Sequence, residues 1–367
     1  MQVLKLTINN FRNIEQALLA PHPRLNFIIG ANGAGKTSVL ESLVMLSKGR
    51  SFRSGSHRDL IGPSEKHLQL YCELETSKHK HKHKLGIERS ISRWRGRLDG
   101  EEVKHRSGLA HLLPYVLFEP NSHLLVDGGP VYRRQYLDWS VFHVKPNFLS
   151  AWYRFHRSLK QRNALLKQAA TSANHTILDS LDLQLAEAAL AITNMRREAF
   201  NTLVPHITQA LASITSTLPD VSLEYSRGWS GEGYPAYLAE NRRRDAEAGQ
   251  TLGGPHRADI AMLYGRDKVK DRFSRGQQKA LACAMLVAQI EHLQENKIEP
   301  LVLLDDPASE FDSEVLSCLF KRVYSSSLQL WITSVAPDLP AWLGDLKNNK
   351  SGYAVFHVKH GKVSKML

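Results

Sequence analysis

The sequence of 367 residues predicts an α/β fold in which helices cover a mostly parallel β-sheet. Two observations lead to this fold class. An apolar run at 25–29 passes through a glycine-rich turn into the helix-compatible segment 38–46. A second buried strand, predicted at 300–304, follows a long apolar helix and ends in two aspartates. Continuous apolar strands that alternate with helices are typical of a parallel sheet buried on both faces.

The glycine-rich turn matches the pattern GxxxxGK[ST] of a phosphate-binding loop. It consists of Gly30, Ala31, Asn32, Gly33, Ala34, Gly35, Lys36 and Thr37. Glycines let several backbone N–H groups point at one anion, and the helix that follows adds the positive end of its dipole. Lys36 would reach the β- and γ-phosphates, and Thr37 would bind Mg²⁺. The alternative, a glycine turn that binds nothing, is disfavoured because a strand precedes the turn and a helix follows it.

The composition indicates a globular protein with a polyanionic partner. The net charge is +12 and the isoelectric point about 9.5, and basic surfaces bind phosphate backbones by releasing counterions. The longest apolar stretch, 280–288, is too short to span a membrane, and the N-terminus lacks the features of a signal peptide, so we expect a cytoplasmic protein. Cys72, Cys283 and Cys318 stand among apolar neighbours, which favours buried, reduced thiols.

The first hundred residues read mainly as short strands. We predict strands at 3–8, 15–19 and 25–29, a turn at 9–13, an antiparallel meander from residue 68 onward, and a further strand at 115–118. The basic loop 48–55 between the first helix and the meander either contacts phosphates or is simply solvated.

A basic run in this meander leaves two readings open. The segment 78–106 carries ten Lys or Arg and four Asp or Glu, and it begins with the alternating Lys/His run 78–84, predicted to be a turn. Such a run is usually solvated surface, and its histidines could bind stray metal. Because Trp94 stands among Arg93, Arg95 and Arg97, a contact with a phosphate backbone is the competing reading.

The middle of the chain has helical periodicity from about 150 to 218. A break at 171–174 divides it into two long helices, which we predict to form a hairpin. Its basic residues lie either on a solvated face or on a DNA-facing one; they include Arg154, Arg157, Lys160 and Arg162. We read the polar segment 226–249 as a linker that returns to the first domain.

The last third supplies the remaining polar groups. Asp305 and Asp306 end a buried strand, the place where ligands bind in open α/β sheets, so Asp305 would hold Mg²⁺ opposite Thr37 and Asp306 would polarise the attacking water. An acidic pair can also be a plain polar cap. Ser274 suits a helix N-cap and Gly276 permits close approach, which makes this helix start a second anion-binding end, fitted to a nucleotide held by another subunit. The last strand is predicted at 329–333.

These segments resemble a known group of proteins. In order, GANGAGKT, FSRGQQKAL and LVLLDDPASEFD are similar to the motifs of the ABC-type ATPases of chromosome maintenance, the group containing SMC and Rad50. Within that group the closer resemblance, over nearly the whole chain, is to the RecF family of bacterial recombination-repair proteins. It rests on the opening Asn10-Phe11-Arg12-Asn13, on GGPVYRRQYLDW, on LKQRNALLK and on Gly254-Pro255-His256-Arg257.

The resemblance implies how the chain is organised. The fold would be a P-loop ABC-type ATPase head with an antiparallel meander, comprising residues 1–125 and 250–367, with an inserted helical lobe at 126–249. ATP and Mg²⁺ would bind at the loop and at Asp305, with Arg12 as a further nucleotide-binding residue. Ser274, Gly276 and Gln277 would contact the nucleotide of a second copy, and 309–312 would cross the interface of an ATP-dependent homodimer.

The resemblance also implies a function. The chain would bind single-stranded or gapped DNA or single-strand/double-strand junctions, promote RecA loading together with RecO and RecR, support SOS induction, and hydrolyse ATP slowly as a DNA-stimulated switch. ABC enzymes usually carry Glu where Asp306 stands and His where Ser334 stands, and Asn121 is the candidate for the glutamine of the loop between lobes. Two alternatives from other classes are a P-loop small-molecule kinase and the nucleotide-binding subunit of an ABC transporter.

Overall fold

A six-stranded sheet, parallel except at one edge, carries the phosphate-binding loop in the computed structural model of this protein. The strand order is β15-β14-β3-β13-β12-β8, and only the β14–β15 pair is antiparallel. The strands are β3 (Leu25–Ile29), β8 (Tyr115–Phe118), β12 (Leu301–Leu304), β13 (Leu330–Ser334), β14 (Ala354–Lys359) and β15 (Lys362–Lys365). Every residue of β3, β12 and β13 is buried, as expected for parallel strands covered on both faces.

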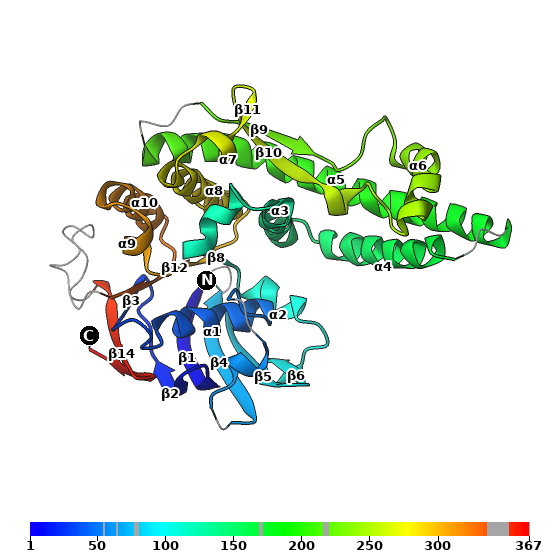
Figure 1. Cartoon of the computed structure of the whole chain (residues 1–367). Coiled ribbons are helices and arrows are strands. Elements are labelled where there is room, and N and C mark those ends of the chain that lie inside the picture. Colours follow the sequence, from blue (N-terminus) through cyan, green and yellow to red (C-terminus); the bar gives the residue numbers. More distant parts are fainter. Residues whose placement is uncertain are drawn as a thin grey trace. The chain divides into compact units, whose positions relative to one another are not determined.

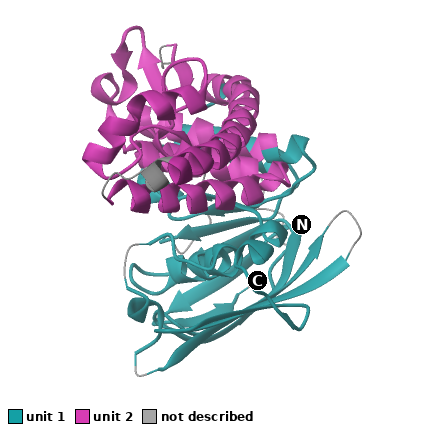
Figure 2. Cartoon of the chain, turned by 90° about the vertical axis from the view of Figure 1, so that its right-hand side faces the viewer, with its two compact units in different colours: residues 1–122, 213–215, 293–367 teal, residues 123–212, 216–292 magenta. Residues whose placement is uncertain are grey.

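The structure describes residues 1–53, 56–63, 65–76, 81–168, 172–215, 220–335 and 352–366. These residues form two compact units, shown in Figure 2. Unit 1 comprises Met1–Ser122, Ser213–Thr215 and Leu293–Leu367, and unit 2 comprises His123–Ala212 and Ser216–His292. No helix among the described residues combines the length and apolar character that a membrane-spanning segment requires.

The second sheet of unit 1 is the predicted antiparallel meander, in the order β2-β1-β4-β5-β6-β7. Its strands are β1 (Gln2–Phe11), β2 (Ile14–Leu19), β4 (His67–Thr76), β5 (His81–Ser90), β6 (Trp94–Leu98) and β7 (Glu101–Glu102). Helix α1 (Lys36–Lys48) contacts β1 and β4 of this sheet and β13 of the parallel one (Figure 1). Because α1 touches both sheets, all of its residues except Thr37 and Lys48 are buried.

The other elements of unit 1 are short, apart from one helix. They are η1 (Arg58–Leu60), α2 (Ser107–Leu112), η2 (Pro120–Leu125, which extends past the unit boundary), α9 (Pro307–Glu310) and α10 (Ser313–Ser325). Asp312 begins α10 as an N-cap whose carboxylate accepts the amide N–H groups of Glu314 and Val315.

Unit 2 is mainly helical. Its elements are α3 (Pro130–Val144), α4 (Phe148–Leu166), most of α5 (Ser172–Ile214), β9 (Ser222–Ser226), α6 (Tyr234–Ala248), η3 (Pro255–Arg257), β10 (Asp259–Tyr264), β11 (Asp267–Lys268), α7 (Val269–Arg272) and most of α8 (Arg275–Glu295). Helices α4 and α5 lie side by side (Figure 1), joined by an ion pair between Arg154 and Glu187 with 3.4 Å between nitrogen and oxygen. These two helices occupy the segment for which the sequence predicts a hairpin.

Several boundaries differ from the sequence-based predictions. Strand β1 runs to Phe11, so the turn is confined to Arg12 and Asn13. The segment 226–249 is not a plain linker, because Pro235 in the first turn and a left-handed Gly249 at the C-cap bound helix α6. Strands β14 and β15 follow the strand that we took as the last. Of the predicted Lys/His turn, 78–80 lies outside the described residues and 81–84 begins β5; of the predicted helix break, Thr171 lies outside them and α5 begins at Ser172.

The compact units also divide the chain differently from the predicted domains. Residues 250–292, which we expected to join 1–125, have most of their contacts in unit 2. Helix α8 packs on α3 there: the hydroxyl of Tyr136 donates to the carbonyl of Met285 at 2.8 Å, and the side-chain amide of Gln289 donates to the carbonyl of Tyr136 at 2.9 Å.

Candidate functional site

The phosphate-binding loop connects β3 to α1, the context that its pattern requires. Gly33 and Gly35 have φ angles of +75° and +118°, in the left-handed region that favours glycine. At Gly35 a Cβ atom would lie 2.9 Å from Oδ1 of Asn13, so a larger residue would collide with the turn after β1. The loop conformation therefore depends on glycine at these two positions.

The two strands missing from the sequence-based prediction support this loop. The amide of Gly361, in the turn between β14 and β15, donates to the carbonyl of Ala34 at 3.0 Å. Gly361 approaches the turn after β1 so closely that a Cβ there would lie 1.8 Å from the carbonyl oxygen of Asn13. Asn13 in turn donates to the carbonyls of Gly33 and Ala34 at 3.1 and 2.9 Å. The turn between β1 and β2 and the turn between β14 and β15 thus both hold the phosphate-binding loop in place.

Lys36 lies inside the loop with only 7% of its surface exposed. Its ammonium donates to the carbonyls of Gly30 and Ala31 at 2.9 and 3.0 Å. Burial lowers the pKa of Lys36, and the nearby carboxylates of Asp306 and Asp305 partly oppose this shift. The structure therefore holds a cation at the mouth of the loop, where phosphate oxygens would bind.

Asp305 lies beside Thr37, as predicted. Its Oδ1 accepts hydrogen bonds of 2.8 Å from the hydroxyls of Thr37 and Thr333. Burial is the main cause that raises the pKa of Asp305, with repulsion from Asp306 adding to it, while the two hydroxyl hydrogen bonds lower it. A hydroxyl and a carboxylate form the oxygen donor set that Mg²⁺ prefers, so these residues fit a magnesium site.

Asp306 follows in a left-handed conformation with φ +45° and begins α9 as its N-cap residue. Its amide donates to the hydroxyl of Thr333 at 2.7 Å, so one threonine orients both aspartates. Asp is among the non-glycine residues that tolerate this conformation best. The left-handed turn directs the chain away from β12 at the point where the pocket lies.

One pocket of about 440 Å³ brings most of these residues together. It is lined by Arg12, Asn13, Asn32, Gly33, Gly35, Lys36, Thr37, Ser38, Arg53, Asp59, Pro63 and Asp306. Of the eight predicted loop residues, Gly30, Ala31 and Ala34 contribute backbone carbonyls to the hydrogen bonds described above rather than lining the pocket. Sequence reasoning did not assign Asn13 or Asp59 to the site, since nothing in their local sequence marks them as neighbours of the loop. Arg53 belongs to the basic loop 48–55, for which a phosphate contact was one of the two readings.

Arg12 reaches the pocket from the turn after β1. Its guanidinium binds the buried carboxylate of Glu41 through Nε at 3.1 Å and Nη2 at 2.6 Å, and its Nη1 donates to the carbonyl of Asp59 at 2.9 Å. Glu41 also lies 3.7 Å from Arg53, which comes from the basic loop predicted at 48–55. Glu41 therefore holds two arginines at the rim of the pocket, which favours the phosphate-contact reading of that basic loop.

Glu119 is a further acidic group near the site, and the sequence analysis did not single it out. It directly follows β8, and the amide of Asp305 donates to the carbonyl of the preceding Phe118 at 2.8 Å. Burial, with a smaller contribution from Asp305, raises the pKa of Glu119 to about 7, while Lys48 opposes this shift. A carboxyl group that titrates near neutral pH thus lies next to the proposed magnesium ligand.

The second predicted anion-binding end lies in unit 2, at the start of α8. The amide of Ser274 donates to Oε1 of Gln277 at 2.9 Å, and the amide of Gln277 donates to Oγ of Ser274 at 3.3 Å. This reciprocal pair is a capping box. Among the described residues, a Cβ at Gly276 would meet nothing closer than Oγ of Ser274 at 4.0 Å, so packing against these residues does not explain the glycine. The exposed helix start leaves room for a ligand from outside.

The other residues that the sequence analysis considered for the site lie in the following elements. Residues 309–312 lead from α9 into the N-cap of α10. Ser334 is the buried last residue of β13, and Asn121 is exposed in η2.

One basic residue that we predicted to lie on an exposed face of the helical hairpin is buried instead. Arg162 is completely buried, where its guanidinium binds Asp182 at 2.6 Å and Asp245 at 2.7 Å. It therefore lies on neither a solvated nor a DNA-facing surface. The sequence could not reveal this, because Asp245 comes from α6, the segment that we read as a linker.

Strand alternation separates Trp94 from its arginine neighbours. Trp94 and Gly96 face one side of β6, whereas Arg95 and Arg97 face the other and are exposed. On the outer side, Arg95 lies 3.7 Å from Glu88, and the strand register places Glu75 and Glu73 of β4 opposite Lys82 and Lys84 of β5. The outer basic residues thus face acidic ones, which favours the solvated-surface reading for the described part of the Lys/His run.

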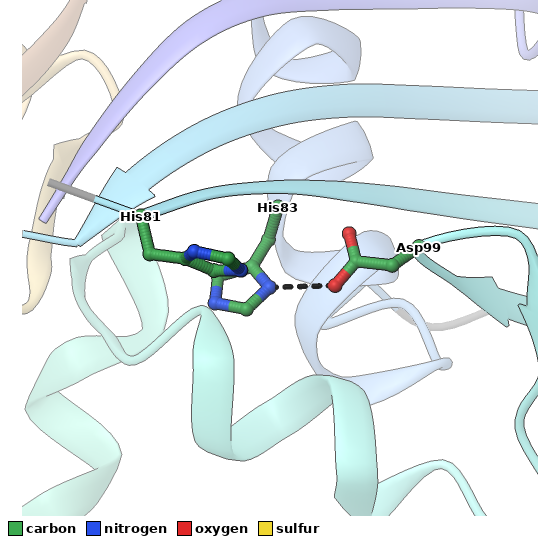
Figure 3. Close-up of side chains that lie close together, drawn as sticks. All are labelled: His81, His83 and Asp99. Atoms are coloured by element: carbon green, nitrogen blue, oxygen red, sulfur yellow. Dashed lines mark hydrogen bonds and ion pairs between the residues drawn. The ribbon is translucent and has the colours of Figure 1, made fainter. Parts of the chain in front are cut away.

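The same run brings two histidines close to an aspartate. In Figure 3 the rings of His81 and His83 lie edge to face beside Asp99, and Nδ1 of His83 is 2.7 Å from Oδ2 of Asp99. Their possible ligand atoms all lie within 4.8 Å of one another. Asp99 also accepts the amide of Lys84 at 2.7 Å. The cluster is separate from the nucleotide pocket.

The three cysteines are free thiols, as expected, with Cys72 and Cys283 buried and Cys318 partly exposed. Burial raises the pKa of Cys72 to about 12, so this thiol stays protonated and unreactive.

Comparisons with known proteins agree with this architecture. The family model described as the RecF/RecN/SMC N-terminal domain matches residues 2–361. The DNA replication and repair protein RecF of Stenotrophomonas maltophilia is 39% identical over 369 residues, which cover 99% of each chain. RecF of Mannheimia succiniciproducens is 36% identical over 369 residues, with full coverage of both chains.

Solved structures show the same fold. A structure of the recombination mediator protein RecF with ATP has a TM-score of 0.87 at 23% identity and covers all of this chain and 98% of its own. An SMC head bound to the C-terminal winged-helix domain of ScpA has a TM-score of 0.59 at 15% identity, with the same coverage. The predicted fold class is therefore confirmed.

Proposed function

The chain belongs to the RecF family of DNA replication and repair proteins, and from this membership we propose that it is an ATP-dependent DNA-binding protein of recombinational repair and replication. The observation that carries the proposal is the shared hydrogen-bond system of Thr37, Asp305 and Thr333 beside Lys36 and Asp306. It brings together a phosphate-binding loop, a carboxylate that would bind the metal ion, and a second carboxylate that would orient the attacking water. These are the parts that nucleoside triphosphate hydrolysis requires.

Each residue has a distinct role in the proposed reaction. The loop amides and Lys36 bind the phosphates, and Thr37 with Asp305 binds Mg²⁺, which would neutralise charge on the phosphate oxygens. Asp306 would orient the attacking water and accept its proton as the water oxygen bonds to the γ-phosphorus. The bond from the γ-phosphorus to the bridging oxygen breaks, that oxygen leaves with ADP, and inorganic phosphate is released. Asp306 is one methylene shorter than the glutamate usual at this position, which fits slow turnover.

We further propose that ATP joins two copies of the chain. The capping box at Ser274 and Gln277, with the unobstructed Gly276, suits the γ-phosphate of a nucleotide held by a second copy. Residues 309–312 would lie at the same interface. Hydrolysis would then separate the copies, so that ATP acts as a switch for DNA binding.

The proposed DNA target is single-stranded or gapped DNA or a single-strand/double-strand junction, and the proposed setting is the bacterial cytoplasm. RecO, RecR and RecA would be partners, with RecA loading and SOS induction as the outcome. One solved RecF structure is described as that of a recombination mediator in the RecFOR pathway, which supports this assignment for the family. The small-molecule kinase does not account for the helix start at Ser274 or for the net charge of +12, and the helical hairpin of α4 and α5 argues against the transporter subunit.

The test is molar mass by light scattering without nucleotide, with ADP and with ATP·Mg²⁺. We expect the mass to double only with ATP, and to stay doubled longer in Asp306→Asn. Asp220→Asn, which changes an exposed aspartate of unit 2, is the charge-matched control and should behave like the wild type. A mass that ignores nucleotide would exclude the switch and revive the kinase reading.

DNA binding is tested separately, by anisotropy of labelled gapped duplex. We expect binding with ATP and weaker binding with ADP. Equal binding with both nucleotides would show that the nucleotide does not control DNA binding.

A further inference from the structure

Two neighbouring side chains, Arg89 and Trp94, each place a buried hydrogen-bond donor on the inner face of the meander, the face that carries the buried residues Leu85 and Ile87. Arg89 on β5 and Trp94 on β6 are directly opposite in the strand register, so their side chains lie on the same face. Nε of Arg89 and Nε1 of Trp94 are both buried, and neither has a hydrogen-bond partner among the residues that the structure describes. Arg89 is only 5% exposed. Buried donors without acceptors are uncommon and costly in a folded protein.

A second guanidinium adds to this excess of donors. Arg106 is exposed, and its Cζ lies 5.3 Å from the centre of the Trp94 ring. Among the residues that the structure describes, no hydrogen bond or ion pair involves the guanidinium of Arg89 or of Arg106. Burial, and after it the charge of the nearby Arg106, lower the pKa of Arg89.

Two glycines allow these groups to come together. A Cβ at Gly96 would lie 2.5 Å from the Trp94 ring, and a Cβ at Gly49 would lie 2.6 Å from Cδ of Arg106. Gly49 is also the left-handed C-cap of α1, so the aliphatic part of the Arg106 side chain packs against the backbone at the end of this helix. Glycine at position 96 therefore leaves room for the Trp94 ring, and glycine at position 49 leaves room for the side chain of Arg106.

The outer face of the same strands is different. There Arg95 has Glu88 at 3.7 Å, and Lys82 and Lys84 stand opposite glutamates of β4. On the inner face, by contrast, Arg89 stands opposite Leu68 and Trp94 in the strand register, and Arg106, the residue before α2, adds a second guanidinium there. An oxyanion would supply the acceptors that these N–H groups lack, because it can accept hydrogen bonds from several donors at once.

We propose that Arg89, Trp94 and Arg106 form a phosphate-binding site that holds the backbone of bound DNA. This assignment rests on the proposed DNA-binding function, and the chain's net charge of +12 favours a polyanion over an isolated anion. Arg106 reaches the phosphate from solvent, Arg89 receives it at the inner end, and the Trp94 ring supplies an aromatic surface beside it. The site lies in the meander, apart from the residues that line the nucleotide pocket.

The test uses the full chain with ATP·Mg²⁺ and a labelled gapped duplex, titrated at several salt concentrations. Arg106→Gln and Arg89→Met should each weaken DNA binding about fivefold to tenfold and reduce the slope of log affinity against log salt by about one. Arg95→Gln is the matched control on the same hairpin and should leave the slope unchanged. ATP binding should be the same in all variants.

Thermal unfolding gives a second measurement that separates this site from a structural role. Arg89→Met removes a buried charge without a partner, so its midpoint should equal or exceed that of the wild type. If the midpoint instead falls together with DNA binding, and the exposed Arg106→Gln binds DNA normally, Arg89 is structural and the proposal is wrong.

The remaining outcomes distinguish the possible failures. Equal salt slopes for Arg106→Gln, Arg95→Gln and the wild type would overturn the phosphate site and leave DNA binding itself intact. Absence of DNA binding by the wild type would overturn the proposed function and the DNA assignment together. If inorganic phosphate raises the midpoint of the wild type but not of Arg106→Gln, while both bind DNA equally, the site takes a small free oxyanion and not DNA.

Discussion

The hydroxyl of Thr37 donates a 2.8 Å hydrogen bond to the carboxylate of Asp305, although 268 positions separate the two residues. Thr37 is the second residue of α1, and Asp305 directly follows β12. The parallel sheet makes this contact possible, since the carboxyl ends of its strands meet at one edge. Thr333, from β13, binds the same carboxylate oxygen and the amide of Asp306. The four predictions below test this site and the elements around it.

Thr333→Val should uncouple the two aspartates. It removes one donor from Asp305 and leaves the amide of Asp306 without its acceptor, so we expect a loss of about 1–3 kcal/mol in the free energy of unfolding and a higher Mg²⁺ requirement for ATP hydrolysis. Urea unfolding and phosphate release measure these. Thr193→Val is the matched control, because the buried Thr193 hydroxyl has no hydrogen-bond partner in the described part of the chain and its loss should cost nothing. Equal effects of the two variants would contradict the role of Thr333.

Lys36→Met should abolish most nucleotide binding. Hydrogen bonds to charged groups contribute about 1.5–3 kcal/mol, so the affinity for a fluorescent ATP analogue should fall roughly tenfold or more. Lys321→Met, at an exposed position of α10, should bind the analogue like the wild type. Unchanged ATP-dependent DNA binding by Lys36→Met would refute the assigned role.

Ser274→Arg should block pairing of two copies without blocking ATP binding. The long charged side chain would fill the exposed helix start and remove the hydroxyl that accepts the amide of Gln277. Light scattering with ATP·Mg²⁺ should give the monomer mass, whereas the control Ser150→Arg, at an exposed position of α4, should still double. A Ser274→Arg variant that dimerises with ATP would show that this helix start is not at the interface.

Glu119 should make stability depend on pH in the neutral range. Burial is the main cause that raises its pKa from 4.5 to about 7, so the folded state favours the protonated form. Its contribution to stability is present below about pH 4.5 and is lost as the pH rises through 7. Glu119→Gln, which cannot ionise, should therefore gain stability relative to the wild type between about pH 5 and pH 8, by at most roughly 3 kcal/mol.

Chemical unfolding of the nucleotide-free chain at a series of pH values measures this difference. Glu65→Gln, which changes an exposed carboxylate, should follow the wild type at every pH. A constant difference between Glu119→Gln and the wild type across this range would show that Glu119 does not titrate there.

Features encoded in consecutive residues were predictable. The phosphate-binding loop, the strand before Asp305 and the start of α8 each combine a local pattern with a physical requirement, such as glycine where φ is positive or a hydroxyl at an N-cap. Strands β3 and β8 have the predicted bounds, and β12 differs from the predicted 300–304 only in starting at Leu301, because their apolar runs are bounded by turn or acidic residues. Helix α6 was missed although Pro235 and Gly249 mark its ends, because its polar composition outweighed these signals in the prediction.

What the sequence determined by itself is the chemistry available at each strand end and helix start. The tertiary structure decided which charges are compensated. Arg162 appeared to be a surface residue and is buried between Asp182 and Asp245, whereas Arg89 appeared to belong to an ordinary basic run and has no acidic partner among the described residues. The reason is physical: electrostatic compensation depends on distances between strands and helices that are remote in the chain, and a sequence shows spacing along the chain only.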